Sequence, residues 1–424
     1  MHDLRMVREQ IDALRAGMRR RGVLDTLSPT IDRAVELDKT RRETIQAVEE
    51  RKAARNAVSQ QVGQRKRAGE SADDLQQQSR ALGEEIARLD TELAATEAEL
   101  SGILLELPNI TLDEVPAGGE ENNSVVRSWG TPREGERIQP HWEVGTRLGI
   151  IDFERGAKIS GSGFIVFRDK GATLVRALMN LMLDVHTREH GYQETWVPVV
   201  VNRVSMTGTA QLPKFEDDMY ALKDEDAFLI PTAEVPLTNL FRDEVLAVAD
   251  LPKAVTAYSP CFRREAGAAG KDTRGLLRVH EFDKVELVRF VLPETSGDQL
   301  ELLTSQAEKI LQLLELPYRV IRLASGDTGF ASAHTYDLET YAPGVGKWLE
   351  VSSCSNFTDF QARRANIRYK PADGGKPRFL HTLNGSGLAF PRVIASILEH
   401  HQQEDGSVRV PAALRTYLGA ERLS

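Results

Sequence analysis

The stretch CFRREAGAAGKDTRGLLRVHEFDKVELV, residues 261–288, carries more information about the fold than any other part of the sequence. Two strand-like runs flank a loop that contains three glycines, which predicts a long antiparallel hairpin. Alternation along each strand would place Arg263 and Glu265 on one face of the first strand. It would place Arg278, Phe282 and Glu286 on one face of the second. One pleated surface would then carry guanidiniums and carboxylates together.

The residue types on this hairpin suit a phosphorylated ligand with polar groups. Arginine binds phosphate well because its planar fork donates hydrogen bonds in pairs and stays charged. A carboxylate can hold an ammonium group or a hydroxyl group. The same alternation of charge is also typical of a solvated hairpin face with cross-strand ion pairs, and these residues alone leave both interpretations open.

A second informative segment, FLHTLNGSGLAFPRVIASILEHHQQEDG, spans residues 379–406. It predicts a polar strand that leads into an apolar helix with a proline in its first turn. Arg392 follows that proline. A positive charge in the first turn of a helix is unfavourable with respect to the helix dipole unless an anion compensates it. A bound phosphate would do so. The alternative is an ion pair between Arg392 and a nearby carboxylate, such as Glu399 or Asp405.

The N-terminal quarter of the chain has a different composition. Residues from about 31 to 107 contain no proline and are rich in Glu, Arg, Gln, Ala and Leu, as in long helices. Spacings of four and three, typical of a coiled-coil seam, relate one set of apolar positions. These positions are Leu82, Ile86, Leu89, Leu93, Thr96, Leu100 and Ile103. With a turn in residues 63–73, the simplest structure is an antiparallel helical hairpin with arms of about 50 Å.

The first helix of this hairpin and its tip are basic. The residues concerned are Arg41, Arg42, Arg51, Lys52, Arg55, Arg65, Lys66 and Arg67. Such a surface suits a phosphate backbone, although a solvated coiled-coil face that serves dimerisation or spacing would have the same composition. Glycines and prolines after Leu107 end the helical pattern, so we expect one domain over residues 1–110 and another over 111–424.

Composition limits the class of protein. The net charge of -9 is unlike that of a dedicated nucleic-acid binder, so RNA contacts would be local and no DNA partner is expected. No apolar run approaches the roughly 20 residues of a membrane span, and the charged N-terminus is unlike a secretory signal. A cytoplasmic location without a membrane partner is therefore expected. The two distant cysteines, Cys261 and Cys354, favour neither disulfides nor zinc.

Several co-linear segments resemble the class II aminoacyl-tRNA synthetases, and among them the bacterial seryl-tRNA synthetases. They are PTAEVPLTN (231–239), the FRREAG…DTRGLLRVHEFDKVE run, LEVSSCSNFTDFQARR (349–364) and TLNGSGLAFPR (382–392). The helix and strand that end at Pro198 resemble the class motif that forms the dimer interface. The resemblance covers essentially the whole chain. It departs from the family's pattern at His334, Phe357 and Phe390–Pro391, none of which is a proposed ligand.

The resemblance implies an α+β fold: a class II catalytic domain, built on an antiparallel β-sheet flanked by helices, with an N-terminal antiparallel coiled-coil arm. It implies that Arg263 binds the α-phosphate of ATP and Arg392 the γ-phosphate. Glu350 and Ser353 would hold Mg²⁺, the expected cofactor. The full ATP-binding set implied is Arg263, Arg264, Glu265, Arg278, Val279, Phe282, Glu350, Val351, Ser352, Ser353 and Arg392. The loop 266–275 is expected to cover ATP and to contact the tRNA acceptor end.

The implied reaction activates L-serine with ATP and transfers it to tRNA(Ser), with tRNA(Sec) left open as a second acceptor. The implied serine pocket contains Thr232, Glu234, Arg263, Glu286, Asn384 and Ser386, and the implied enzyme is a homodimer. The implied tRNA-binding residues of the arm are Arg41, Arg51, Arg55, Arg65, Lys66 and Arg67. Two other classes stay open: a catalytically silent RNA-binding or scaffold protein, and a ligase that loads an amino acid onto a carrier protein.

Overall fold

The computed structural model describes residues 1–133, 138–265 and 274–424. The chain forms two compact units, Met1–Pro108 and Asn109–Ser424. Residues 266–273 lie outside the described residues, so the expectation for most of the loop 266–275 stays a prediction. Within the described ranges, no helix is both long and apolar enough to span a membrane.

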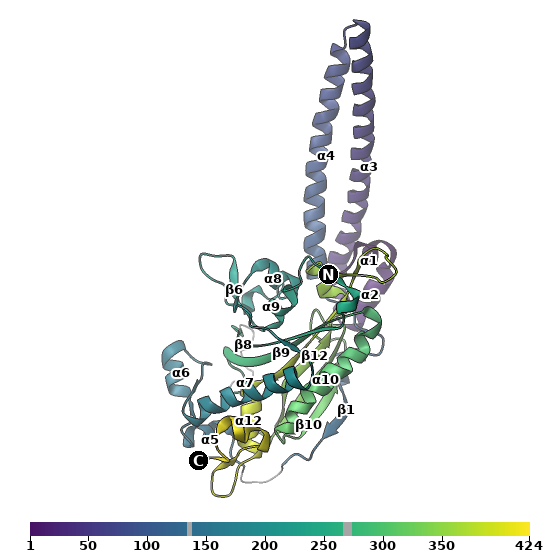
Figure 1. The fold of residues 1–424 in the computed structure, drawn as a ribbon. Helices are drawn as coiled ribbons and strands as arrows, with labels where there is room; N and C mark the ends of the chain where they lie inside the picture. The colour runs from purple at the N-terminus through teal and green to yellow at the C-terminus, as the bar shows by residue number, and fades with distance from the viewer. Residues whose placement is uncertain (134–137, 266–273) are drawn as a thin grey trace. The chain divides into compact units, whose positions relative to one another are not determined.

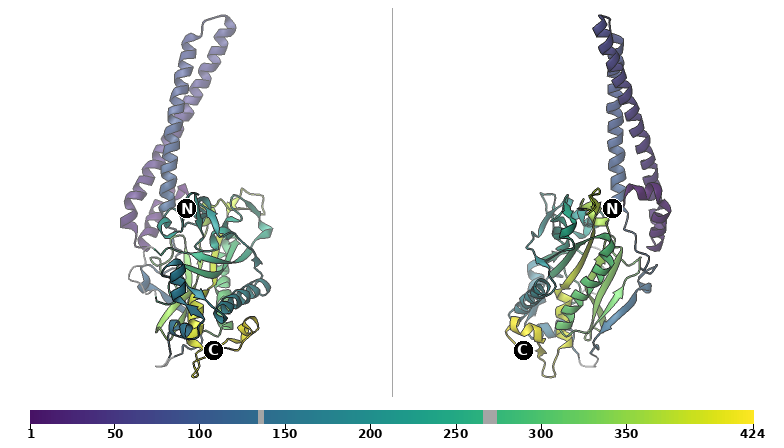
Figure 2. Two further views of the ribbon diagram at one scale, coloured as in Figure 1. Left: turned by 90° about the vertical axis from the view of Figure 1, so that its left-hand side faces the viewer. Right: turned by 45° about the vertical axis from the view of Figure 1, so that its right-hand side comes forward.

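The N-terminal unit is helical, with two long helices that pair antiparallel. Short helices α1 (Leu4–Glu9) and α2 (Ile11–Arg20) precede α3 (Leu24–Ala68) and α4 (Asp73–Glu106). The long helices lie side by side in both views of Figure 2. Ile86, Leu89 and Leu100 of the predicted seam are buried, so the coiled-coil periodicity is confirmed. The predicted turn at 63–73 is too long, because helix α3 continues through Gly63 to Ala68, where Gly69 caps it in the left-handed conformation.

The C-terminal unit is built on an eight-stranded sheet whose order is β1-β10-β11-β12-β15-β9-β8-β4 (Figure 1). All its pairings are antiparallel except that of β4 with β8. The strands are β1 (Ser124–Trp129), β4 (Gln193–Glu194), β8 (Lys253–Phe262), β9 (Glu281–Val291), β10 (Tyr318–Arg322), β11 (His334–Ala342), β12 (Lys347–Asn356) and β15 (His381–Ala389). The predicted α+β class is confirmed.

One face of this sheet packs against three helices. They are α7 (Lys170–Arg188), α10 (Ser296–Leu313) and α12 (Phe390–His400). Leu174, Leu178 and Leu181 recur at helical spacing on α7, and they join Val285 and Leu287 of β9 in one apolar cluster. Because side chains alternate along a strand, Lys284 and Glu286 of β9 point to the opposite face. That face carries the polar site.

Smaller elements complete the unit. The remaining helices are α5 (His141–Arg147), α6 (Phe153–Ser160), α8 (Arg203–Gly208), α9 (Glu234–Asn239), α11 (Phe360–Arg364) and α13 (Arg415–Leu418). The minor strand pairings are β2 (Ile151–Asp152) with β3 (Val166–Phe167), β5 (Val200–Asn202) with β6 (Ala227–Leu229), β16 (Val408–Arg409) with β17 (Arg422–Leu423), and β13 (Arg368–Lys370) with β7 (Val245–Ala247) and β14 (Arg378–Phe379). Helices α9 and α11 pack with β8 and β9 at the end of the polar face.

Candidate active site

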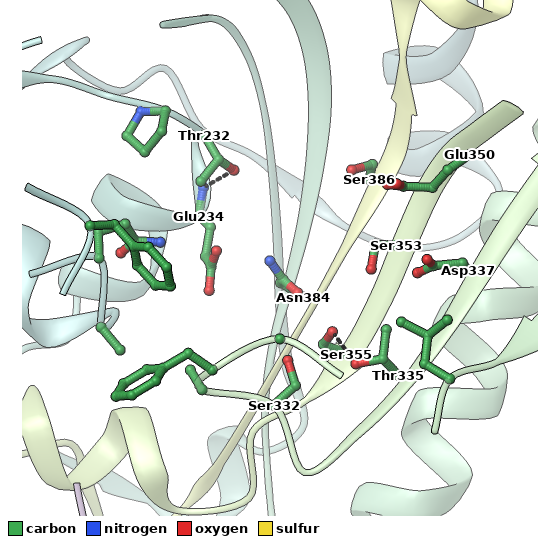
Figure 3. A pocket seen from close by; sticks show the side chains of 18 of the residues that line it. Thr232, Glu234, Ser332, Thr335, Asp337, Glu350, Ser353, Ser355, Asn384 and Ser386 are labelled. Atoms are coloured by element: carbon green, nitrogen blue, oxygen red, sulfur yellow. Dashed lines mark hydrogen bonds between the residues drawn. The ribbon is translucent and has the colours of Figure 1, made fainter. Parts of the chain in front are cut away.

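A cavity of about 870 Å³ lies over the polar face of the sheet. Strands β11, β12 and β15 supply Thr335, Asp337, Ser353, Ser355, Asn384 and Ser386, while the segment before and within α9 supplies Thr232 and Glu234. Figure 3 shows these two groups facing each other across the cavity. The lining is therefore mostly hydroxyl, amide and carboxyl groups, which suits a small polar ligand.

A second cavity of about 310 Å³ adjoins the first. The two share six lining residues: Arg263, Glu265, Arg278, Lys284, Glu350 and Ser386. The rest of the smaller cavity is formed by Leu276, Leu277, Val279, Phe282, Val351, Ala389, Pro391 and Arg392. It thus combines an aromatic ring and apolar walls with three guanidiniums, a combination that suits a nucleotide.

A buried charge network forms the floor of the larger cavity. Lys284 is 5% exposed and Glu286 is fully buried. The Lys284 ammonium forms an ion pair with Glu286 and donates a hydrogen bond to Thr232 Oγ1 over 2.9 Å. Thr232 Oγ1 donates to Glu286 Oε2 over 3.0 Å, and Asn384 Nδ2 donates to Glu286 Oε1 over 3.2 Å. Glu286 lines neither cavity itself; it orients the groups that do.

Glu234 lies beside this network and is itself buried. Burial raises its pKa to about 7, and the neighbouring Glu286 carboxylate contributes to the rise. Gln361 opposes the rise by donating a hydrogen bond from Nε2 to Glu234 Oε1 over 2.6 Å. A carboxyl group that titrates near neutral pH therefore faces the cavity.

Arg263 lines both cavities, and its guanidinium lies 5.1 Å from the centre of the Phe282 ring. Among the residues that the structure describes, no carboxylate forms an ion pair with Arg263. An uncompensated cation at the junction of two cavities is a suitable group for an anionic ligand.

Arg392 lies in the first turn of α12, as predicted, and lines the smaller cavity. Its Nε donates to the Leu277 carbonyl oxygen over 3.1 Å, and its Nη1 donates to the Glu350 carbonyl oxygen over 2.8 Å. The two carboxylates suggested as partners are wrong, because Glu399 pairs with His141 and Asp405 pairs with Arg422. Arg392 does form an ion pair with a nearby carboxylate, that of Glu350, over 3.5 Å.

The predicted strand alternation is partly wrong. Strand β8 ends at Phe262 and β9 begins at Glu281, so Arg263, Glu265 and Arg278 lie beyond the strand ends. Glu265 has a positive φ of 51°, which turns the chain sharply after the strand. The side chains still meet, because Arg278 forms an ion pair with Glu265 and both line the cavities.

Glu350 and Ser353 reach the same cavity although they are three residues apart. Regular alternation would place them on opposite faces, but the pairing of β11 with β12 shifts register between Leu338 and Glu339. Val351 is the extra residue of this bulge, and the bulge turns both side chains toward the cavity.

Asp337 lies close to the Glu350–Ser353 pair. Burial and the charge of Glu350 raise the pKa of Asp337 well above its usual value. Its Oδ1 atom has no hydrogen-bond partner within the described ranges. The region thus concentrates oxygen donors and negative potential, which suits a hard divalent cation. In the described part of the chain, however, no group of three or more His, Cys, Asp or Glu side chains is placed to hold a metal ion by itself.

The structure does not bring two of the predicted ATP-binding residues to either cavity. Ser352 is buried on the opposite face of β12, where its hydroxyl donates to the Ser386 carbonyl oxygen over 2.6 Å. Arg264 is exposed, and its backbone N–H donates to the Asp218 carbonyl oxygen. Of the predicted set, Val279, Val351 and Phe282 do line the smaller cavity.

Sequence reasoning missed Lys284, Asp337 and Gln361. Lys284 had a detectable signal, since it shares the strand alternation of Phe282 and Glu286. Asp337 likewise alternates with Thr335 along β11. Gln361 gave no comparable signal, because it reaches Glu234 from a separate helix, α11.

Several predicted RNA-binding residues of the arm are engaged in cross-helix ion pairs. Arg41 pairs with Glu97 over 2.8 Å, Arg51 with Glu85 over 3.0 Å and Arg65 with Asp74 over 2.9 Å. Among the described residues, Arg55, Lys66 and Arg67 form no such pair, and Lys66 and Arg67 are exposed near the turn. The unpaired positive charge is therefore concentrated toward the tip.

Comparisons with known proteins agree with the architecture of both units. A family description of the tRNA synthetase class II core domain (G, H, P, S and T) matches residues 214–401. Together with the antiparallel sheet, this match defines the chain as a class II aminoacyl-tRNA synthetase. A description of the seryl-tRNA synthetase N-terminal domain matches residues 1–111.

The individual relatives are more specific. The serine–tRNA ligase of Gemmatimonas aurantiaca is 65% identical over 420 residues, covering 99% of each chain, and that of Geobacillus kaustophilus is 54% identical over 421 residues with the same coverage. The crystal structure of seryl-tRNA synthetase from Pyrococcus horikoshii complexed with ATP has a TM-score of 0.94 at 37% identity, covering 100% of this chain and 99% of that one. The chain belongs to the seryl-tRNA synthetase family. As a member, it is an ATP-dependent ligase that joins serine to tRNA.

Proposed function

We propose that the larger cavity binds L-serine and that the smaller one binds ATP, so that the serine carboxylate attacks the α-phosphorus where the cavities join. The first step forms seryl-adenylate and releases pyrophosphate. In the second step the terminal ribose hydroxyl of tRNA(Ser) attacks the activated carbonyl, and AMP leaves. The observation that carries this proposal is the shared lining: Arg263 stands between a polar pocket and an apolar, arginine-containing one.

Arg263 and Arg392 are the proposed catalytic residues. Arg263 is assigned the α-phosphate, because it lies where the cavities join and forms no ion pair with a described carboxylate. Arg392 is assigned the γ-phosphate, because it lines the smaller cavity but not the larger one. Fixed positive charge at both positions stabilises the negative charge that develops as pyrophosphate departs.

Glu350 and Ser353 are the proposed protein ligands of Mg²⁺. They supply two oxygen atoms, and Mg²⁺ usually completes its shell with substrate phosphates and water. The orphaned Oδ1 of Asp337 is consistent with a cation in this region. When bound, the ion would neutralise phosphate charge and polarise the phosphoryl oxygens.

Thr232, Glu234, Asn384 and Ser386, oriented by Glu286, are the proposed contacts for serine. An acidic pocket attracts the substrate ammonium, and its hydrogen-bonding groups favour a substrate hydroxyl. Alanine would leave buried polar groups unpaired, which is a large penalty. Threonine must be excluded by the steric cost of its methyl group, so it should be the harder competitor to reject.

The arm is the proposed site for tRNA, through its basic tip and the unpaired Arg55. Recognition there would rely on shape and phosphate contacts, because the arm presents no aromatic residues for base stacking. Since tRNA(Sec) also receives serine, it is the second acceptor to test. The enzyme is proposed to act in the cytoplasm.

A homodimer is proposed as the functional unit. Trp196 is 82% exposed, and Val200 and Val204 nearby in the chain are also exposed. Trp196 lies in the segment that resembles the class motif for dimerisation, and Val200 and Val204 follow that segment. Covering these side chains with a second copy would remove apolar surface from water.

Serine-dependent ATP–pyrophosphate exchange tests the activation step. Purified chain should exchange label with serine and much less with threonine or alanine. Folded protein without exchange would reject the proposal and favour a catalytically silent relative. Charging of purified serine tRNA, compared with charging of a carrier protein, separates the synthetase from a carrier ligase. Charging of the carrier alone would reject the tRNA step.

A further inference from the structure

The segment Arg274–His280 forms a wall of the smaller cavity although it belongs to no helix or strand. Two consecutive residues of this segment are held by side chains. The backbone N–H of Leu276 donates to His141 Nε2 over 3.0 Å. The carbonyl oxygen of Leu277 accepts from Arg392 Nε over 3.1 Å. Leu276 and Leu277 are therefore held by two particular side chains, whereas His280, at the end of the segment, forms backbone hydrogen bonds with Arg263 and Gly163.

His141 connects this wall to the helix that carries Arg392. His141 is fully buried, and its Nδ1 lies 2.7 Å from Glu399 Oε1, whose side chain is also fully buried. Glu399 belongs to α12, the helix that starts with Arg392 in its first turn. One imidazole ring thus joins the wall residue Leu276 to the same helix.

The two contacts fix the ring's tautomer. Because Nε2 accepts from the Leu276 N–H, it carries no proton, so Nδ1 carries the hydrogen and donates it to Glu399. Glu399 also accepts from the backbone N–H groups of His141 and Gly344, over 2.9 Å and 2.7 Å. These bonds hold the carboxylate, and the carboxylate in turn holds the ring in the orientation that Leu276 requires.

The wall segment packs closely against the ring. Gly275 has a positive φ of 67°, and a Cβ atom added there would collide with His141 Nε2 and with Trp142. The guanidinium of Arg274 lies 4.6 Å from the centre of the Trp142 ring. Three consecutive residues of the wall segment therefore pack against His141 and Trp142.

We infer that His141 is a positioning residue for the nucleotide site: through its bond to Leu276 it holds the wall of the smaller cavity at a set distance from Arg392. The inference rests on the proposed function, since it takes the smaller cavity as the ATP site. His141 itself lines neither cavity, so its effect must act through the backbone of Leu276. It should be specific for ATP, because the serine contacts lie on other elements.

Two isosteric variants separate the two contacts of the ring. His141→Asn places an amide N–H near the position of Nδ1, so it keeps the donor to Glu399 and loses the acceptor for Leu276. His141→Gln places an oxygen near the position of Nε2, so it keeps the acceptor for Leu276 and loses the donor to Glu399. His141→Asn should raise the KM for ATP in pyrophosphate exchange roughly tenfold, the effect of an unsatisfied buried N–H. The kcat and the KM for serine should change less than about twofold.

His401→Asn is the matched control. His401 is also buried and adjoins α12, where its Nε2 lies 3.0 Å from the Leu314 carbonyl oxygen. This variant should lower the thermal midpoint as His141→Asn does and leave the KM for ATP unchanged. His141→Gln should restore the KM for ATP to within about twofold of the wild-type value. Gly275→Ala displaces the ring by its added Cβ, so it should raise the KM for ATP even if His141→Asn fails to fold.

The outcomes are separable. An unchanged KM for ATP in both His141→Asn and Gly275→Ala, with active wild-type protein, would overturn the inference and leave the proposed function intact. An equal rise of the KM for ATP in His401→Asn would also overturn it, since general loss of stability would then be the cause. Wild-type protein without serine-dependent exchange would instead reject the proposed function.

Discussion

The titration of Glu234 should set the pH dependence of serine binding. Its pKa is raised from 4.5 to about 7, so the group changes charge within the working range of the enzyme. Only the ionised carboxylate attracts the ammonium group of serine. The ionised fraction rises about tenfold between pH 6 and pH 8 for such a group, so the KM for serine should fall by a similar factor over that interval.

The same shift has a defined effect on stability. Burial favours the neutral carboxyl in the folded chain, whereas the unfolded chain ionises near the usual value. The folded chain therefore binds an extra proton between about pH 4.5 and pH 7, and the free energy of unfolding falls as pH rises through this window. A shift of about 2.5 units corresponds to about 3 kcal/mol, lost by pH 7 and constant above it.

Glu234→Gln removes the titration and preserves the shape and the acceptor for Gln361. The KM of this variant for serine should not change between pH 6 and pH 8, and it should be close to the wild-type KM at pH 6. Its urea midpoint should also lose the decline between pH 5 and pH 7. The exposed Glu421 supplies the control variant Glu421→Gln, which should keep both wild-type profiles.

Initial rates of pyrophosphate exchange at varied serine, and urea melts at each pH, measure the two profiles. A wild-type KM for serine that does not change between pH 6 and pH 8 would refute the reasoning. So would a Glu234→Gln variant that retains the full wild-type slope, because the titrating group would then be another residue.

Three further substitutions test other parts of the structure. Lys284→Met leaves the buried Glu286 carboxylate without its cation and should cost about 3–5 kcal/mol of unfolding free energy in urea melts. The double variant with Glu286→Gln should recover much of this stability without recovering exchange activity. If the effects of the two single substitutions on stability simply add, the two side chains do not act as a pair. Arg263→Ala should lower kcat/KM for exchange by about 100-fold or more with little change in the urea midpoint, and near-normal exchange would move the phosphate role elsewhere. Lys66→Glu combined with Arg67→Glu should raise the KM for tRNA and flatten its salt dependence without affecting exchange, whereas an unchanged KM would reject the tip as a contact.

The sequence predicted the elements in which local periodicity and burial agree. The apolar seam from Leu82 to Ile103 keeps heptad spacing along most of a long helix, and few structures other than a coiled coil fit that pattern. The polar strand before Arg392 and its apolar helix are equally clear, because the period changes from two to 3.6 at one point and a proline marks the helix start. Strand β9 was predictable for the same reason.

What escaped prediction depends on departures from regular structure. The turn at Glu265 and the bulge at Val351 each change which face a side chain reaches, and neither has a strong local signal. Arg263 and Arg278 were therefore assigned to strands that end before reaching them. Gln361 contacts Glu234 across more than a hundred residues of sequence, so only the folded chain brings the two together.

Glu286, Asn384 and Ser386 stand on neighbouring central strands, β9 and β15, whose backbone amides are bonded on both sides. Central strands of this kind open to solvent exchange only when the whole unit unfolds. The strand-borne half of the proposed serine pocket is thus expected to belong to the most slowly exchanging part of the chain. Thermal loss of adenylate formation should coincide with global melting, so exchange activity can serve as a direct assay of the folded fraction.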